Sequence, residues 1–153
     1  MKQLPDRLER LVASLEALER SDRIQMLVDA GKQYRRVPAD VASPPFPVEH
    51  RVPDCESEAY VWAKPNSNGT LSFYFAVDNP QGISAMALAS VLAKTLSGVP
   101  LDQVAAVPGD IVYRIFGREL SMGKSLGLMG MVNMVASLAR QHLPSASQPR
   151  HAR

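Results

Sequence analysis

Between residues 70 and 77, apolar and polar side chains alternate without a break. The apolar set is Leu71, Phe73, Phe75 and Val77, and the opposite set is Ser72, Tyr74 and Ala76. Successive side chains of a β-strand point to opposite faces, so this period of two predicts a strand with one apolar face. Residues 58–64 are rich in strand formers and residues 65–69 are turn formers, which predicts that the two strands form an antiparallel hairpin.

Helical periodicity precedes this hairpin. Apolar residues recur at helical spacing from Leu8 to Leu18, with charged residues on the other side. A second helix is predicted up to Tyr34, with Ser21 as its N-cap and Gly31 near its end. We expect the two helices to form an antiparallel pair.

The rest of the chain divides into a loop before the hairpin and helices after it. Five prolines between residues 38 and 53 predict a stiff loop. Further helices are predicted at 86–96, 100–107, 110–116 and from Ser121 to about Leu143, with Asp110 and Ser121 as caps and Gly98 and Gly117 as stops. Because strands and helices are segregated along the chain, the predicted fold is α+β, with a small antiparallel sheet packed against several helices.

Length and composition fit one globular domain. The chain has 153 residues, 46% of them hydrophobic and 21% charged. We expect the domain to span residues 1–143 and the tail, 144–153, to be disordered. The net charge of +2 does not indicate a nucleic-acid-binding surface. The longest charge-free stretch, 125–139, is shorter than the ~20 residues of a membrane span, so no transmembrane helix is predicted. Charges throughout residues 1–22 argue against a secretory signal, so the predicted location is the cytoplasm.

The chain has one cysteine, Cys55, and therefore no CxxC pair for a zinc ribbon or a dithiol redox centre. A lone cysteine is most often a small buried hydrophobe. Its neighbours Pro53, Asp54, Glu56 and Ser57 are loop formers, however, and indicate a turn entering a strand, where reactive groups are often held. Both interpretations stay open at this point. The two adjacent carboxylates disfavour the thiolate, so the thiol is not expected to be activated by its own loop.

His50 is the nearest candidate base, five residues before Cys55. A Cys–His pair would activate a nucleophile, but a solvent-facing histidine in a proline-rich loop is the simpler interpretation. No HExxH, GxSxG or Gly-rich phosphate loop is present. A poorly activated surface thiol is therefore suited to chemistry in which a partner's active site supplies the activation.

Three segments together resemble the SufE family of sulfur acceptor proteins, over nearly the whole chain from Leu8 to Leu143. They are RVPDCESEAYVW at 51–62, TLSFYFAVD at 70–78 and LSMGKSLGLMGMVNMVASLAR at 120–140. The resemblance implies a SufE/IscU-like fold in which Cys55 takes persulfide sulfur from a SufS-type, pyridoxal-phosphate-dependent cysteine desulfurase, activates that enzyme and relays sulfur to an iron–sulfur scaffold. It implies an accessory sulfur-transfer protein more than a stand-alone enzyme, with no cofactor or metal of its own.

The resemblance also implies further site residues. Lys124 stands where the family has an arginine near the cysteine, and Ser57 belongs to the Cys-x-Ser motif. Asp78 matches an acidic position near the site, although an aspartate there also ends a strand. Asp54 replaces a common glycine, and Glu58 replaces the glutamine that usually follows the serine.

The last predicted helix is rich in methionine and glycine. Its methionines Met122, Met129, Met131 and Met134 are interpreted as core filling rather than as a binding groove. Its glycines Gly123, Gly127 and Gly130 predict close backbone packing.

Two other functions compete with the sulfur relay. A scaffold of the related IscU class would need three cysteine ligands, whereas this chain has one cysteine. A degenerate SufE-like protein-binding module without sulfur transfer is the remaining alternative, because Asp54 and Lys124 depart from the family pattern.

Overall fold

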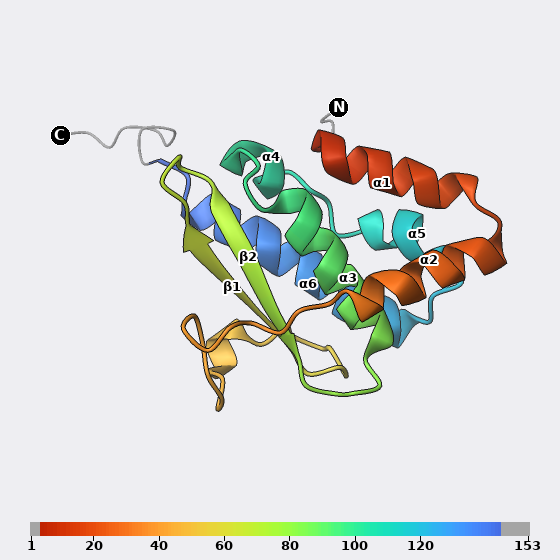
Figure 1. Ribbon diagram of the computed structural model, residues 1–153, viewed down its shortest axis with the longest axis horizontal. Helices are drawn as coiled ribbons and strands as arrows, with labels where there is room; N and C mark the ends of the chain where they lie inside the picture. The colour runs from red at the N-terminus through yellow and green to blue at the C-terminus, as the bar shows by residue number, and fades with distance from the viewer. Residues whose placement is uncertain (1–3, 145–153) are drawn as a thin grey trace.

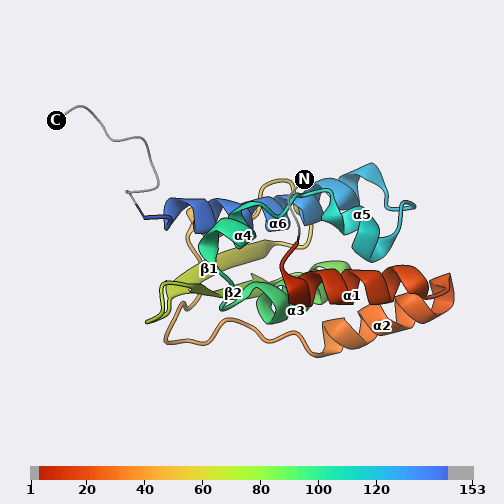
Figure 2. The ribbon, with the colours of Figure 1, turned by 90° about the horizontal axis from the view of Figure 1, so that it is seen from above.

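The computed structural model describes residues 4–144 and has the α+β architecture that the sequence predicts (Figure 1). The predicted disordered tail, 144–153, lies outside the described residues except for Pro144. In chain order, the elements are α1 (Asp6–Ala17), α2 (Arg20–Lys32), η1 (Val48–His50), β1 (Ala59–Pro65), β2 (Leu71–Val77), α3 (Ile83–Leu96), α4 (Leu101–Ala105), α5 (Ile111–Phe116) and α6 (Met122–Gln141). Figure 2 shows α6 on one side of the molecule and α1 and α2 on the other, with the hairpin between them.

The hairpin confirms the prediction from alternation. The strands β1 and β2 pair antiparallel from Ala59 opposite Val77 to Pro65 opposite Leu71. The turn between them is held by its own polar side chains, since the Thr70 hydroxyl donates to Asn68 Oδ1 at 2.6 Å. The predicted apolar face of β2 is buried against α3, while β1 packs against α6.

The opposite face of the hairpin is also covered, which the prediction of one apolar face missed. Trp62 and Ala76 are buried there under Val37. Phe46, from the proline-rich loop, packs edge-on against Trp62 with ring centroids 4.8 Å apart. Val37 N–H also donates to the Phe75 carbonyl at 2.8 Å, so the loop covers part of the open edge of β2.

The first two helices reverse direction as predicted, but α2 packs mainly against α3 rather than α1. The predicted cap is wrong: α2 begins at Arg20, and Ser21 lies inside its first turn. Gly31 lies near the end of α2, as predicted, one residue before its last residue, Lys32. A Cβ at Gly31 would lie 3.5 Å from the Ile83 carbonyl oxygen, so this glycine faces the start of α3.

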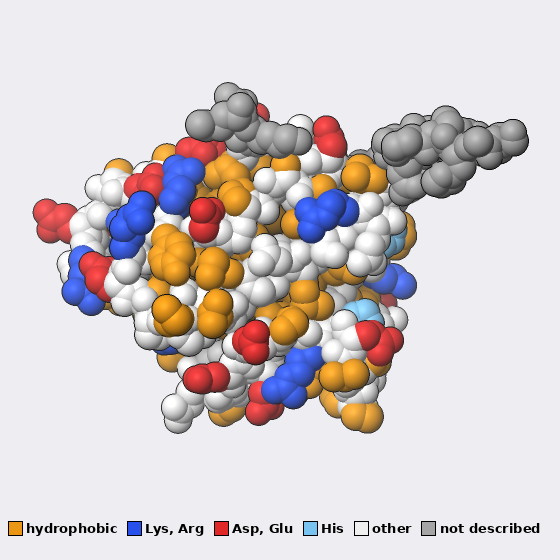
Figure 3. Space-filling model, turned by 180° about the vertical axis from the view of Figure 1, so that it is seen from behind, with side chains coloured by type: hydrophobic (Ala, Val, Ile, Leu, Met, Phe, Trp, Pro, Cys, Tyr) orange, Lys and Arg blue, Asp and Glu red, His pale blue; other side chains and the backbone are white. Residues whose placement is uncertain are grey.

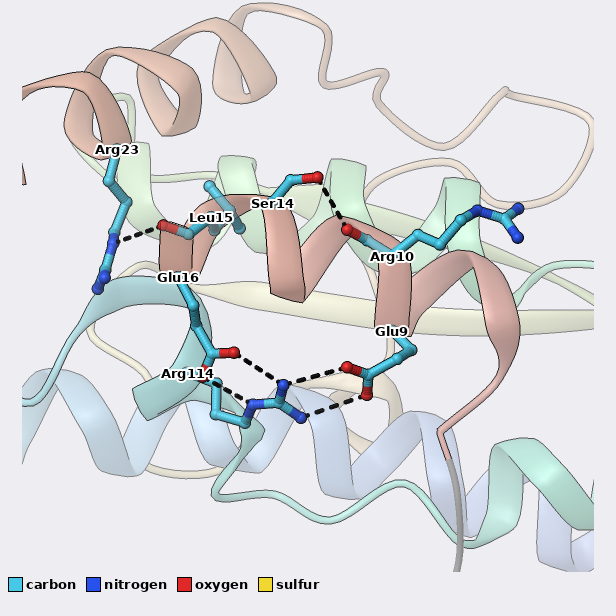
Figure 4. A network of polar contacts seen from close by, with 7 residues as sticks. All are labelled: Glu9, Arg10, Ser14, Leu15, Glu16, Arg23 and Arg114. Atoms are coloured by element: carbon cyan, nitrogen blue, oxygen red, sulfur yellow. Dashed lines mark hydrogen bonds and ion pairs between the residues drawn. The ribbon is translucent and has the colours of Figure 1, made fainter. Parts of the chain in front are cut away.

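Arg114 ties the short helix α5 to α1 (Figure 4). Its guanidinium donates to both carboxylate oxygens of Glu16, at 2.8 and 2.9 Å. It also donates to both oxygens of Glu9, at 3.3 and 3.4 Å. These bidentate hydrogen bonds from Arg114 hold the pKa of Glu16 below its usual value.

The last helix, α6, starts as predicted, because the Ser121 hydroxyl accepts from Lys124 N–H at 3.2 Å. Met131 is fully buried, and Met129 and Met134 are partly buried against the core. Met122 is 79% exposed, so the core-filling interpretation is wrong for this residue. Among the described residues, no helix is both long and apolar enough to cross a membrane.

Candidate functional site

Cys55 lies between two consecutive turns that connect the proline-rich loop to β1. Val52 N–H donates to the Ala59 carbonyl at 2.8 Å and closes the base of this loop. Two residues of the loop have left-handed backbone conformations, Asp54 with φ 58° and Glu58 with φ 53°. This conformation favours glycine, and aspartate is one of the few other residues that adopt it readily. Asp54 can therefore hold this turn without a glycine.

The Cys55 loop is seated on glycines of α6. Cys55 is only 8% exposed, so the thiol is buried although it belongs to a turn, a question that the sequence left open. A Cβ at Gly127 would lie 3.0 Å from Cys55 Cα, and a Cβ at Gly130 would lie 3.0 Å from Val52 Cγ1. Close packing is thus confirmed at these two glycines. A Cβ at Gly123 would meet nothing within 4 Å, and the prediction is wrong there.

A small cavity of about 60 Å³ adjoins the Cys55 thiol. Its walls come from the Cys55 loop, the start of α3 and the first turns of α6, and they include Ser57 and Lys124. The structure therefore brings together three of the four site residues predicted from the sequence. Lys124 and Glu56 supply the charged groups of the wall, and both side chains are exposed at the cavity mouth.

Ser57 fixes the cavity wall on the side of α3. Its carbonyl accepts from Asn79 N–H at 3.1 Å. A Cβ at Gly82 would lie 2.8 Å from both Cβ and Oγ of Ser57, which only glycine avoids. Ser57 thus packs directly against the residue that precedes α3.

Asp78 lies outside this cavity wall. It ends β2, and its N–H donates to the Glu58 carbonyl at 3.1 Å. Its carboxylate forms a salt bridge with Arg36 at 2.8 Å. The strand-ending role is visible in these contacts, whereas a role in sulfur chemistry stays a prediction.

His50 does not form a pair with Cys55. Its Nδ1 lies 2.9 Å from the Val61 carbonyl oxygen, and because a carbonyl only accepts, Nδ1 donates. Its ring stacks on Trp62 at 5.3 Å between centroids. His50 therefore anchors the proline-rich loop on β1 and does not line either hollow beside the thiol.

An open groove of about 670 Å³ runs over the outer side of the Cys55 loop. Its lining includes Val48, which is 78% exposed, and Leu126, which is 49% exposed. Met122 next to it is 79% exposed, and Ile83 on the cavity wall is 55% exposed. Sequence periodicity missed this apolar ring, because it does not distinguish an exposed apolar side chain from a buried one. Large exposed apolar patches mark interaction surfaces.

Across residues 4–144, no group of three or more His, Cys, Asp or Glu side chains is arranged to hold a metal ion.

Comparisons with known proteins give a family from one source and a fold from another. Residues 9–139 match the family described as "SufE: Fe-S metabolism associated domain". A comparison with curated proteins finds no match. Among solved structures, the chain is similar to the solution structure of a hypothetical protein from Thermus thermophilus, with a TM-score of 0.70 and 21% identity. That alignment covers 92% of this chain and 98% of the other, which establishes a common fold.

Proposed function

Since the chain belongs to the SufE family and so has a role in iron–sulfur metabolism, we propose that Cys55 is a persulfide carrier fed by a SufS-type cysteine desulfurase. In this role the protein activates the desulfurase by unloading it, and then passes the sulfur to an iron–sulfur scaffold. The observation that carries the proposal is the position of the chain's one thiol, on the wall of a small cavity and beneath an exposed apolar groove.

The transfer is a thiol exchange that needs no external redox partner. The Cys55 thiolate attacks the terminal sulfur of the desulfurase persulfide, and a new S–S bond forms as the old one breaks. The desulfurase cysteine leaves as a thiolate, and the proton lost by Cys55 goes to a base of the partner or to water. Cys55 then carries the sulfane sulfur at unchanged oxidation level.

The cavity gives the transferred sulfur a protected place. Its volume of about 60 Å³ exceeds that of one additional sulfur atom, and Cys55 itself is 8% exposed. Solvent reductants have little access to a persulfide held there. The ammonium group of Lys124 at the mouth stabilises the anionic form of the persulfide and offsets the negative charge of Glu56.

Transfer also requires the loop to move, because a thiol buried against α6 cannot meet a sulfur on another protein. The left-handed residues Asp54 and Glu58 flank Cys55 and are the positions where the backbone can change direction. The exposed apolar side chains Val48 and Leu126 line the groove over the loop and provide a docking surface for the partner that receives it.

The experiment is intact-mass spectrometry after incubation with the desulfurase of the same organism and free cysteine. We expect a gain of one or more sulfur atoms that a reductant removes and that Cys55→Ser lacks. Lys124→Arg should retain the transfer and Lys124→Met should slow it, since only the first keeps the cation. If an active desulfurase gives no sulfur adduct while still binding the protein, the chain is a binding module without sulfur transfer.

A further inference from the structure

A second hollow lies beside the Cys55 cavity. It has a volume of about 420 Å³ and is bounded by α2, the start of α3 and the segment between α5 and α6. Its floor is apolar and consists of Ile24, Leu27, Val28, Phe116 and Leu120. This size is within the range of sites that hold a ligand or an anchoring side chain. We call this hollow the α2 cleft.

The rim of the α2 cleft is basic. Arg20 and Arg23 from α2 and Lys124 from α6 line it, against one carboxylate, Glu119. The side chains of Arg20 and Lys124 make no ion pair or hydrogen bond with any residue in the described range. Arg23 donates only its Nε, to the Leu15 carbonyl at 3.2 Å. The cleft is therefore lined by three cations against one carboxylate, and Arg23 also interacts electrostatically with Glu16 on α1.

Cations and apolar side chains meet on this face of the molecule. Ile24 is 50% exposed and Ile83 is 55% exposed, although both are large and apolar. Seen from behind, the end of the molecule that carries α5 and the start of α6 shows apolar side chains gathered beside both basic and acidic ones (Figure 3). A ligand for this surface needs an apolar group for the floor and negative charge for the rim.

The α2 cleft is continuous with the site of sulfur transfer. Ile83, Ser84 and Lys124 line both the cleft and the Cys55 cavity. A protein that places a persulfide at Cys55 must therefore cover this shared wall, and its surface reaches the cleft in the same step. Because the two hollows share a wall, we infer that the protein in the α2 cleft is the sulfur donor.

We propose that the α2 cleft binds an acidic, apolar segment of the desulfurase, a proposal that rests on the function proposed above. One large apolar side chain of that segment fills the floor, and flanking carboxylates pair with Arg20 and Arg23. The cleft thus contributes recognition and orientation of the donor, and the Cys55 loop contributes the chemistry.

The test compares two doubly charge-reversed variants of equal net charge. Arg20→Glu/Arg23→Glu alters the cleft, and Arg10→Glu/Lys64→Glu alters exposed residues that line neither hollow. Arg20→Glu alone serves as a variant that disturbs no internal contact. Titration calorimetry should show that the cleft variant binds the desulfurase about tenfold or more weakly than the parent, whereas the control binds within about twofold of the parent. The affinity of the parent should fall as the salt concentration rises, and this dependence should be lost in the cleft variant.

Intact mass at saturating desulfurase separates this proposal from the sulfur relay. We expect the cleft variant to be persulfidated at Cys55 to the parent's extent once the donor saturates it. Parent-like affinity of the cleft variant, or equal weakening by the control, overturns the cleft proposal and leaves the relay intact. Absence of sulfur on every variant, with binding still dependent on Arg20, overturns the relay instead.

Crosslinking identifies the occupant directly. A photoreactive benzoylphenylalanine placed at Ile24 should crosslink to a desulfurase peptide that contains acidic residues beside an apolar one. A crosslink to a non-acidic peptide, or to the scaffold protein in preference to the desulfurase in a mixture of the two, refutes the proposed occupant.

Discussion

We expect Gly127→Ala to push the Cys55 loop away from α6. The added Cβ would lie 3.0 Å from Cys55 Cα, 3.2 Å from the Asp54 carbonyl oxygen and 3.3 Å from Cys55 Cβ. Ordinary contacts to carbon are about 3.5–4.0 Å, and two of these three neighbours are backbone atoms that cannot rotate away. The loop as a whole therefore has to shift by several tenths of an ångström.

The magnitude follows from two opposing contributions. Alanine in a helix interior is about 0.5–1 kcal/mol more favourable than glycine. Forcing extra volume into a packed site costs about 1–3 kcal/mol. The helix preference is the same in both loop positions and therefore offsets only the loss of global stability. Because only the seated loop meets the new methyl group, we expect it to lose about 1–2 kcal/mol, the lower part of the packing cost, relative to a loop that has left α6.

The assay is alkylation or DTNB labelling of Cys55, the single thiol of the chain. When a thiol reacts only after local opening, its labelling rate follows the population of the open state. A change of 1–2 kcal/mol raises that population about 5- to 30-fold, so labelling of Gly127→Ala should accelerate by that factor. The free energy of unfolding, measured with urea, should fall by no more than the same amount.

Gly123→Ala is the matched control, because Gly123 is on the same helix and lines the same cavity, while a Cβ there meets nothing within 4 Å. It should label at the parent's rate. If Gly127→Ala also labels at the parent's rate and is no less stable than Gly123→Ala, the loop is not seated on Gly127 and the reasoning fails.

Three further predictions concern the backbone and the titrating groups. Asp54→Gly relieves a left-handed backbone at φ 58°, and we expect urea unfolding to show a gain of up to about 1 kcal/mol, with a loss counting against strain at this residue. Arg114 lowers the pKa of Glu16, so the stabilising contribution of the Glu16 carboxylate is present above the ordinary value of 4.5 and is lost as the pH falls through the lowered pKa. Glu16→Gln should therefore lower the melting temperature at pH 7 and leave it unchanged near pH 2. An equal loss at both pH values would contradict this. Burial raises the pKa of Tyr34, so the parent should lose stability as the pH rises above 10. Tyr34→Phe should be less stable than the parent at pH 7 by about 1–3 kcal/mol, because Val77 N–H loses its acceptor. The same variant should lose less stability than the parent at alkaline pH.

The parts of the fold that the sequence predicted are those determined locally. The period of two in residues 70–77 was sufficient to place β2, and the Ser121 cap marked the start of α6. Ser21 failed as a cap because the N-cap of α2 is Glu19, two residues earlier, and neighbouring residues offer no local signal that distinguishes the two starts.

The parts that the sequence could not predict depend on contacts between distant segments. The burial of Cys55 comes from its seat on Gly127, and the α2 cleft exists because α2 lies beside the start of α3 and the segment between α5 and α6. Arg20, Arg23 and Lys124 look like ordinary solvated charges along the chain. Only their convergence around an apolar floor indicates recognition.

The turn around Cys55 affects the equilibrium between a closed loop, packed on α6, and an open loop, away from α6. Packing on Gly127 and Gly130 holds the loop closed, while its left-handed residues store strain that an open loop can release, about 1–2 kcal/mol at Glu58 and up to about 1 kcal/mol at Asp54. A partner that binds the open loop then needs only a modest differential affinity to expose the thiol. On this argument Gly127→Ala and Asp54→Gly act in opposite directions, since the first strains the closed loop and the second relaxes it. Labelling of Cys55 should therefore be faster than the parent in Gly127→Ala, slower in Asp54→Gly, and intermediate between the two single variants when the changes are combined.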